Sequence, residues 1–309
     1  MNQMENEIPI IIDNNPELKY EKTAGWFYYF VFLPVMFFTT AWVAIKKMIF
    51  GKNLKTNAFW FDGVSPTCRE MKENAMHWKA LDIAYNYKFE KGNDFITEIT
   101  NFWLRINNAK AVRNRLKLVE KKLREEINSV LSRGSEIRLL SIACGSAQGV
   151  IEVMAEFKQK SVIIKAIFLD LDPSAIEYSK KMAQNAGVIN QITFVNRSAG
   201  DLEAAVNEFK PHIVEMVGFL EYRPKEKAII LTEKINKLLT SGGVALISNI
   251  APNFERWFLS QVLNWPMVYR SPKELSEVVI RGGFNPKNCE IVYEPLKIHG
   301  IAICRKLIN

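Results

Sequence analysis

The chain has 309 residues, 48% of them hydrophobic, which is enough for one large domain plus a segment of about a hundred residues. Its four cysteines show no CxxC spacing and it has only three histidines, so we expect a reducing compartment, no disulfide framework and no metal site. The net charge of +8 favours an anionic partner but does not choose among nucleic acid, an acidic lipid surface and an acidic substrate.

The first predicted element is an apolar helix at residues 24–45, AGWFYYFVFLPVMFFTTAWVAI. It contains no ionisable side chain other than tyrosine, and as a helix it would extend over roughly 33 Å, enough to cross a bilayer. Tryptophan and tyrosine lie near its ends. Four lysines follow it directly, at Lys46, Lys47, Lys52 and Lys55. The positive-inside bias therefore predicts a membrane helix with the rest of the chain in the cytoplasm.

Other interpretations of this helix remain open. A cleaved signal peptide is disfavoured, because the apolar run is longer than usual, follows some twenty mostly polar residues and lacks a basic segment before it. Pro34 allows a kink, and the helix could instead lie in one leaflet or cover an apolar pocket of the protein. We predict a single-pass or monotopic membrane protein.

Residues 51–100 mix aromatic and lysine side chains with Gly and Pro breaks, which indicates short helices in a linker or lid. Residues 101–131 repeat apolar side chains at helical spacing, with basic side chains mostly on the other faces. Such a pattern is typical of a solvated helix, and contact with acidic lipid or a substrate carboxylate is the alternative. Nucleic acid is not expected, because no recognition motif accompanies the charge.

Beyond Arg138 predicted strands and helices alternate. The strands are expected at 138–143, 162–170, 191–196, 212–217, 243–249, 288–294 and 298–304, and the helices at 148–158, 173–186, 201–209, 225–240, 254–264 and 271–281. Because a helix follows each of the first five strands, we expect a parallel sheet covered on both faces. The short connection around Pro295 makes the last two strands an antiparallel hairpin.

A turn of small residues, Ala143 to Ala147, follows the first strand. Such a turn at the carboxyl end of a parallel strand leaves room for a nucleotide-like ligand, although a merely tight connection would look similar. It is neither a dinucleotide fingerprint nor a P-loop, which disfavours a nicotinamide-dependent oxidoreductase. The second strand ends in Asp170, which we expect to bind ribose hydroxyls, and Asp172 is expected to cap the helix that begins at Pro173.

Together these residues resemble the class I S-adenosylmethionine (SAM)-dependent methyltransferases over 101–309. LLSIACGSAQG stands where that family has its glycine-rich motif, FLDLDPSAIEYSKK where it has the ribose-binding acid, and HIVEMVGFLEY and LLTSGGVALISNI at its fourth and fifth strands. The resemblance implies an α/β fold, a Rossmann-like seven-stranded mostly parallel sheet with an antiparallel terminal hairpin. Ser141, Ala143 and Ala147 depart from the motif, the first replacing its acid and the others two glycines.

A narrower similarity involves AVRNRL (111–116), SIACGSAQ (141–148) and NFERWFLSQVLNWPMVYRSPKEL (253–275). These segments are similar to methyltransferases that make methyl esters of hydroxylated fatty acids as signals. The similarity implies a fatty-acid-like carboxylate as methyl acceptor.

We therefore divide the chain into a polar tail (1–23), a membrane-anchoring helix (24–50), a helical linker or lid (51–100) and a SAM-dependent methyltransferase domain (101–309). The cofactor-binding residues are predicted to be Ala143, Cys144, Gly145, Ser146, Asp170, Leu171 and Gly218.

The predicted catalytic residues are Arg270, Tyr269 and Glu215. Arg270 would hold an acceptor carboxylate, with Arg113 or Arg115 as second choice. For an amine or hydroxyl acceptor, Glu215, Glu221 or Tyr222 would serve as base or orienting group. The expected partners are a lipid-like or amphipathic small molecule and a membrane. The alternatives are a catalytically silent membrane adaptor of this fold and an N- or O-methyltransferase of a polar small molecule.

Overall fold

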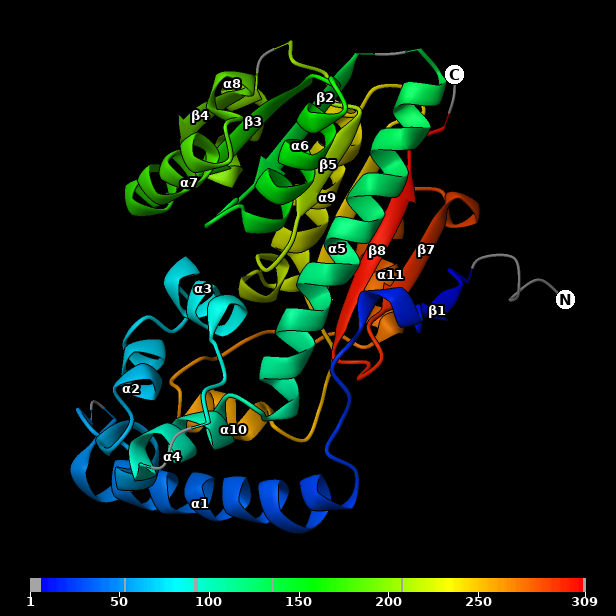
Figure 1. Ribbon diagram of the computed structural model, residues 1–309. Coiled ribbons are helices and arrows are strands. Elements are labelled where there is room, and N and C mark those ends of the chain that lie inside the picture. Colours follow the sequence, from blue (N-terminus) through cyan, green and yellow to red (C-terminus); the bar gives the residue numbers. More distant parts are fainter. Residues whose placement is uncertain (1–6, 53, 92–93, 135, 207, 308–309) are drawn as a thin grey trace, which may run out of the picture. The chain divides into compact units, whose positions relative to one another are not determined.

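The computed structural model describes residues 7–52, 54–91, 94–134, 136–206 and 208–307 (Figure 1). The chain forms two compact units, and neither is continuous in sequence. The sheet unit comprises Met1–Leu18, Arg115–Ala251 and Val268–Asn309, and the helical unit comprises Lys19–Asn114 and Pro252–Met267. This division differs from the one drawn from the sequence, because an amino-terminal strand joins the sheet and a segment after the fifth predicted strand belongs to the helical unit.

The sheet unit is built on one sheet with the strand order β1-β7-β8-β6-β5-β2-β3-β4. The strands are β1 (Ile10–Ile12), β2 (Ile137–Ile142), β3 (Ile164–Asp170), β4 (Ile192–Asn196), β5 (Ile213–Met216), β6 (Val244–Ile250), β7 (Cys289–Tyr293) and β8 (His299–Arg305). In the described residues β8 pairs antiparallel with β6 and β7, and the other pairs are parallel. The predicted mostly parallel sheet with its terminal hairpin is confirmed, and β1 adds a strand that the sequence analysis did not anticipate.

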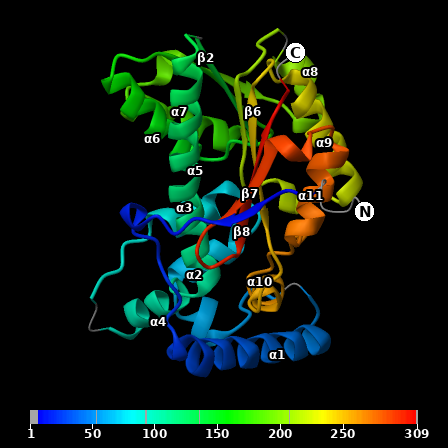
Figure 2. The ribbon, with the colours of Figure 1, turned by 90° about the vertical axis from the view of Figure 1, so that its right-hand side faces the viewer.

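Helices cover both faces of this sheet (Figure 2). On one face lie α5 (Asn107–Ser132), α6 (Gln148–Gln159) and α7 (Pro173–Asn185), and on the other lie α8 (Leu202–Val206), α9 (Lys225–Leu238) and α11 (Pro272–Arg281). All seven residues of β6 are buried, as expected for a strand covered on both sides. Leu231 and Ile235 of α9 and Val278 of α11 belong to the same apolar core as the strands.

Local sequence signals position two of these helices. Asp172 caps α7, because its carboxylate accepts a hydrogen bond from the backbone N–H of Ser174, and Pro173 begins the helix. Ser271 and Glu274 form a reciprocal capping box at the start of α11. The expected cap at Asp172 is therefore confirmed.

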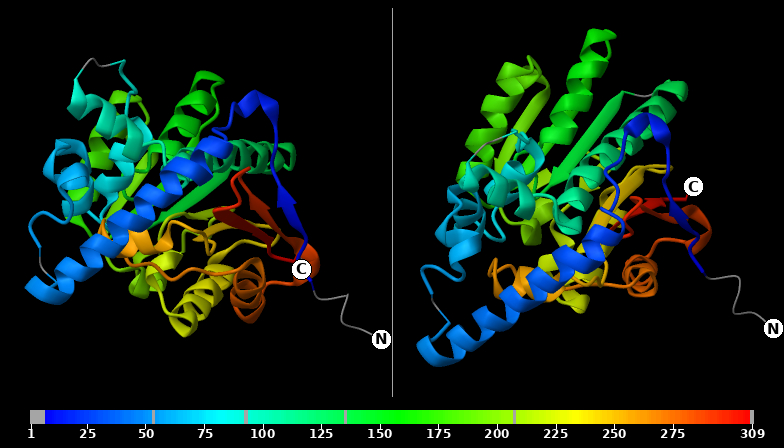
Figure 3. Two further views of the ribbon diagram at one scale, coloured as in Figure 1. Left: turned by 90° about the horizontal axis from the view of Figure 1, so that it is seen from below. Right: turned by 60° about the horizontal axis from the view of Figure 1, so that its bottom comes forward.

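The helical unit contains α1 (Leu33–Phe50), α2 (Pro66–Glu73), α3 (Trp78–Asn86), α4 (Phe95–Trp103) and α10 (Arg256–Gln261). A π-helical segment at Tyr28–Phe32 leads directly into α1, and the two form one helix from Tyr28 to Phe50. Figure 3 shows this long helix as an outer element of its unit. It is long and apolar enough to cross a membrane, a test that buried core helices and signal sequences also pass.

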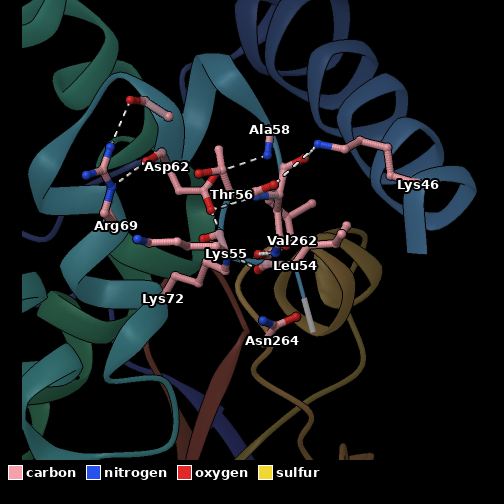
Figure 4. A network of polar contacts seen from close by, with 12 residues as sticks. Lys46, Leu54, Lys55, Thr56, Ala58, Asp62, Arg69, Lys72, Val262 and Asn264 are labelled. Carbon is pink, nitrogen blue, oxygen red and sulfur yellow. Dashed lines mark hydrogen bonds and ion pairs between the residues drawn. The ribbon is translucent and has the colours of Figure 1, made fainter. Parts of the chain in front are cut away.

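A buried carboxylate organises the middle of the helical unit (Figure 4). Asp62 accepts hydrogen bonds from the backbone N–H groups of Asn57 and Ala58 and forms an ion pair of 2.6 Å with Lys72. Lys72 also donates to the carbonyl oxygens of Leu54 and Lys55. Since a buried charge is costly unless it is paired and hydrogen-bonded, these contacts fix the path of residues 54–63.

A second buried carboxylate lies at the start of α5. Glu255 accepts hydrogen bonds from the backbone N–H groups of Asn107 and Asn108, from the Asn108 side chain and from the Tyr28 hydroxyl. These bonds satisfy two of the free N–H groups at a helix amino terminus. Glu255 thereby joins three segments of the helical unit that are distant in sequence.

Candidate functional site

The turn after β2 has an unusual backbone. Ala143, Gly145 and Ala147 all adopt left-handed φ angles, of 52°, 54° and 53°. Glycine adopts this region freely, whereas each alanine costs roughly 1–2 kcal/mol. The strain at Ala143 and Ala147 occurs at two positions where the class I methyltransferases have glycine. The side chains of Ala143 to Ala147 are all small and project little from this backbone, and we call the segment the low turn.

Asp170 at the end of β3 lies against this turn. Its Oδ2 accepts a hydrogen bond from the Gly145 N–H at 2.9 Å, and its Oδ1 accepts one from the Asp172 N–H at 2.9 Å. Burial raises the pKa of the Asp170 carboxyl, while these backbone hydrogen bonds oppose the rise. Two predicted cofactor residues, Gly145 and Asp170, are thus in direct contact, and each Asp170 oxygen retains a second lone pair for a ligand hydroxyl.

Other predicted cofactor residues adjoin this pair. Leu171 is 68% exposed directly after Asp170 and offers an apolar surface. The Asn196 side chain at the end of β4 donates to the carbonyl oxygens of Asp170 and Leu171 and holds their backbone in place. Ser146 is buried, and burial raises the pKa of the Cys144 thiol, which keeps that side chain neutral.

Glu215 of β5 is the predicted catalytic residue nearest to this turn along the sheet. It pairs in register with Ser141 of β2, and the Ser141 hydroxyl donates to its Oε2 at 2.5 Å. Burial raises the pKa of Glu215 to about 7, while the Ser141 hydrogen bond and the charge of Arg115 oppose the rise. Gly218 follows with a left-handed φ of 82°, and its N–H donates to Ser248 of β6.

A buried charged cluster follows at the ends of β5 and β6. Arg115, on α5, forms an ion pair with Glu221 at 3.6 Å, and both side chains are almost completely buried. His299, at the start of β8, is also buried, and neither of its ring nitrogens has a hydrogen-bond partner among the described residues. Burial and the charge of Arg115 hold the pKa of His299 well below its usual range, so this ring is neutral.

Arg270 has a supporting position beside this cluster. Its guanidinium donates to the carbonyl oxygens of Leu220 and Arg223 and to Oδ1 of Asn249. Its own N–H donates to the Ile250 carbonyl, so the segment containing half-buried Tyr269 follows the end of β6. Arg270 thus fixes the segment after β5, and its two Nη atoms are engaged in doing so.

The sheet therefore places two sets of predicted residues at the carboxyl ends of its neighbouring parallel strands. The turn residues and Asp170 lie at the ends of β2 and β3, and Glu215 and Arg270 lie at the ends of β5 and β6. The strained low turn and the adjacent carboxylate fit the adenosyl part of a SAM cofactor. In the described residues no group of three His, Cys, Asp or Glu side chains could hold a metal ion.

No role was predicted from the sequence for His299 or Asn196, and Arg115 was predicted only as a second choice for holding an acceptor carboxylate. His299 carries no local signal, because its place in the cluster depends on the β6–β8 pairing, in which it lies opposite Ile250. Asn196 could have been found, since a polar residue at the carboxyl end of a parallel strand is a candidate ligand or support.

Comparison with solved structures supports this description of the fold. A protein from Bordetella parapertussis described as a possible exported protein is similar with a TM-score of 0.66 and 13% identity, covering 88% of this chain and 95% of that one. Magnesium protoporphyrin IX methyltransferase from Synechocystis, solved with bound SAH, has a TM-score of 0.51 and 12% identity, covering 75% and 95%. An O-methyltransferase family protein from Burkholderia thailandensis has a TM-score of 0.50 and 14% identity, covering 79% and 71%.

At these identities the likeness concerns the fold alone. No curated protein matches the chain in sequence. A family model described as "Putative methyltransferase" matches residues 40–306, which includes most of both units. The chain has the class I SAM-dependent methyltransferase fold and belongs to this methyltransferase family.

Proposed function

We propose that this enzyme transfers a methyl group from SAM to a hydrophobic or amphipathic acceptor at a membrane, with a fatty-acid-like carboxylate as the acceptor group. The observation that carries the proposal is the contact between Gly145 and Asp170 at the carboxyl ends of two adjacent parallel strands. A carboxylate there accepts hydrogen bonds from ribose hydroxyls, and the low turn leaves space for the nucleoside. When bound, SAM supplies an activated methyl group on a sulfonium.

The residues at the ends of β5 and β6 would then meet the acceptor. A carboxylate acceptor is a nucleophile at neutral pH, so it needs a cation to orient it and no general base. We assign this contact to Arg115, whose buried ion pair with Glu221 an acceptor carboxylate would share, since Arg270 uses both Nη atoms in hydrogen bonds to the protein itself. In this assignment Arg270 and the adjacent Tyr269 shape the acceptor side of the site.

A hydroxyl or amine acceptor is the second candidate, and the pKa of Glu215 favours it. A general base works best when its pKa is near the working pH, and burial raises that of Glu215 to about 7. Glu215→Gln distinguishes the two candidates. It should leave turnover of a carboxylate acceptor within a fewfold of the wild type but lower turnover of a hydroxyl acceptor by on the order of 10²-fold or more.

The membrane part of the proposal rests on the apolar helix and its flanking lysines. Either a single pass or attachment within one leaflet would satisfy these features, with the methyltransferase domain in the cytoplasm in both cases. A lipid-facing location suits an acceptor that partitions into the bilayer.

The direct test supplies methyl-labelled SAM and membrane lipid extract to the purified chain and follows label in the lipids by mass spectrometry. Label in a fatty-acid methyl ester supports the carboxylate proposal. Label in an ether or amine supports the second candidate instead. If calorimetry detects no binding of SAM, the enzyme proposal is wrong and the silent adaptor becomes the better interpretation.

A further inference from the structure

The long apolar helix of the helical unit has one face packed on its own unit from Tyr28 to Val43. The buried side chains are Tyr28, Phe32, Met36, Thr39 and Val43, which recur every three or four residues. Phe32 stacks on Phe102 at 4.3 Å, and Thr39 accepts a hydrogen bond of 2.8 Å from the Trp60 indole. This stripe is a packing surface within the unit.

Polar contacts hold both ends of the same helix. At its start the Tyr28 hydroxyl donates to the buried carboxylate of Glu255 at 2.9 Å. At its end Lys46 donates to the carbonyl oxygens of Thr56 and Asn57 (Figure 4). Lys47 donates to the Gln261 carbonyl at 2.6 Å and to the Asn264 side chain at 2.7 Å.

These contacts conflict with a spanning orientation. From Tyr28 to Phe50 the helix is about 34 Å long, comparable to the hydrocarbon thickness of a bilayer. If it stood across the membrane, the segment that packs on the middle of the helix through Trp60, together with the buried Asp62–Lys72 ion pair that follows it, would enter the hydrocarbon. Buried charges of this kind are expensive there.

The opposite face of the helix is exposed and apolar. Phe30, Phe37 and Met48 are 76%, 78% and 81% exposed. The other exposed large apolar side chains from this segment are Trp26, Phe27, Tyr29, Phe38, Trp42, Ile45, Ile49 and Phe50. We call these eleven side chains the apolar face. Soluble proteins rarely leave so many neighbouring large apolar side chains in water.

Neighbouring segments extend this surface. Phe254 and Trp257 are exposed on either side of Glu255, the residue bonded to Tyr28, so they lie near the first turn of the helix. Phe59 is exposed next to Trp60, whose ring stacks on Phe38 of the helix. Aromatic side chains thus border the apolar face on two sides.

We infer that the apolar face lies flat in one leaflet of a phospholipid bilayer, with the helix parallel to the membrane plane and no segment of it crossing. This inference rests on the membrane location proposed above. Tryptophan favours the interface between lipid and water, which suits Trp26 and Trp42 within the face. Exposed Lys22, Lys52 and Lys55 beyond the helix ends would meet anionic headgroups. The same lysines would repel one another across an interface with a second copy, which favours lipid as the occupant.

Vesicle binding by the full chain tests the inference. The variant Phe30→Ser/Phe37→Ser/Met48→Ser should lower the partition coefficient onto phosphatidylcholine–phosphatidylglycerol vesicles by on the order of 10²-fold or more, since three large side chains no longer enter lipid. The matched control Ile163→Ser/Ile230→Ser/Leu307→Ser removes three exposed apolar side chains of the sheet unit and should bind vesicles like the wild type.

SAM binding by calorimetry separates this inference from the proposed function. All vesicle-binding variants should keep wild-type affinity for SAM, because none changes the turn or Asp170. If the protein binds vesicles but does not bind SAM, the proposed function is wrong and the inference about the apolar face is retained. The inference is wrong if the wild-type protein does not bind vesicles and sediments as a dimer while the triple variant sediments as a monomer. In that case the apolar face binds a second copy of the chain.

Depth measurements decide the orientation. Nitroxide labels at Phe30→Cys, Phe37→Cys and Met48→Cys, in a Cys144→Ala background that leaves the buried Cys68, Cys289 and Cys304, report depth in the bilayer. A helix in the membrane plane places all three labels at similar depth. A label at 37 near the bilayer centre, with those at 30 and 48 close to opposite surfaces, would mean that the helix spans the membrane.

Discussion

Replacing Asp170 by asparagine removes charge from the contact with the turn while preserving side-chain shape. Asp170 accepts one hydrogen bond at each oxygen, from Gly145 and from Asp172, both at 2.9 Å. The asparagine amide has only one oxygen, so it loses at least one of these bonds and the charge that strengthens the other. The same loss of charge weakens the hydrogen bonds that the ribose hydroxyls of SAM are proposed to donate to Asp170, and a hydrogen bond to a charged group contributes about 1.5–3 kcal/mol. We therefore expect the Kd for SAM to rise by about 10- to 150-fold.

Calorimetric titration with SAM measures this change, and Asp172→Asn is its matched control. Asp172 lies two residues further on and caps α7, and asparagine is an equally good cap. The control should therefore keep its affinity within about twofold, which is less than 0.5 kcal/mol. Equal losses in the two variants would mean that general destabilisation of the β3–α7 connection explains the effect. Unchanged affinity in Asp170→Asn would remove this carboxylate from the cofactor site.

Three further predictions follow from other residues. Gly145→Val should abolish SAM binding but keep the circular dichroism of the fold, whereas Gly187→Val, which also changes a glycine with left-handed φ, should bind SAM normally. For Glu215, the native pKa near 7 exceeds the ordinary 4.5, so the native state holds the proton longer, and the free energy of unfolding should fall as pH rises from about 4.5 to 7. In the wild type this decrease in the free energy of unfolding should be up to about 3 kcal/mol, and in Glu215→Gln it should be absent. Urea titrations at the two pH values measure it. Glu255→Ala should lower the free energy of unfolding by about 3–5 kcal/mol in urea titrations, because Glu255 accepts several buried hydrogen bonds. The exposed Glu226→Ala is its control. If Glu255→Ala lost less free energy of unfolding than this control, the role of Glu255 as a cap of α5 would be contradicted.

The sheet was predictable because its signals are local. The central strands are apolar runs bounded by turn residues, as burial of both faces requires and as β6 shows, whereas β4 at the end of the sheet has no buried residue. The first strand, β1, was not predictable, since three isoleucines after a polar segment do not specify a partner. Its position depends on pairing with β7, where Ile10 lies opposite Ile291. Such non-local pairing leaves no pattern in a short stretch of sequence.

The long helix was predictable as an element but not in its packing. Its sequence is apolar on every side, so hydrophobic periodicity cannot distinguish the face that contacts protein from the face that is exposed. Lys46 and Lys47 were interpreted as topological charges, but the structure shows them bonded to backbone and side-chain oxygens of the helical unit. The same limit applies to Arg270, whose three oxygen partners come from two other segments of the sheet unit.

The pairing of β1 with β7 has a consequence for synthesis on the ribosome. The sheet cannot be completed until β8, which joins β7 to β6 and ends at Arg305, has left the exit tunnel, although β1 is synthesised long before it. Closing so long a loop adds little to the equilibrium cost but delays this step of folding. During the interval the nascent chain presents Phe30, Phe37 and Met48 while its catalytic sheet is unfinished. Early contact with a membrane would shield these side chains from aggregation, so we expect folding yield in cell-free translation to rise when vesicles are present from the start rather than added afterwards.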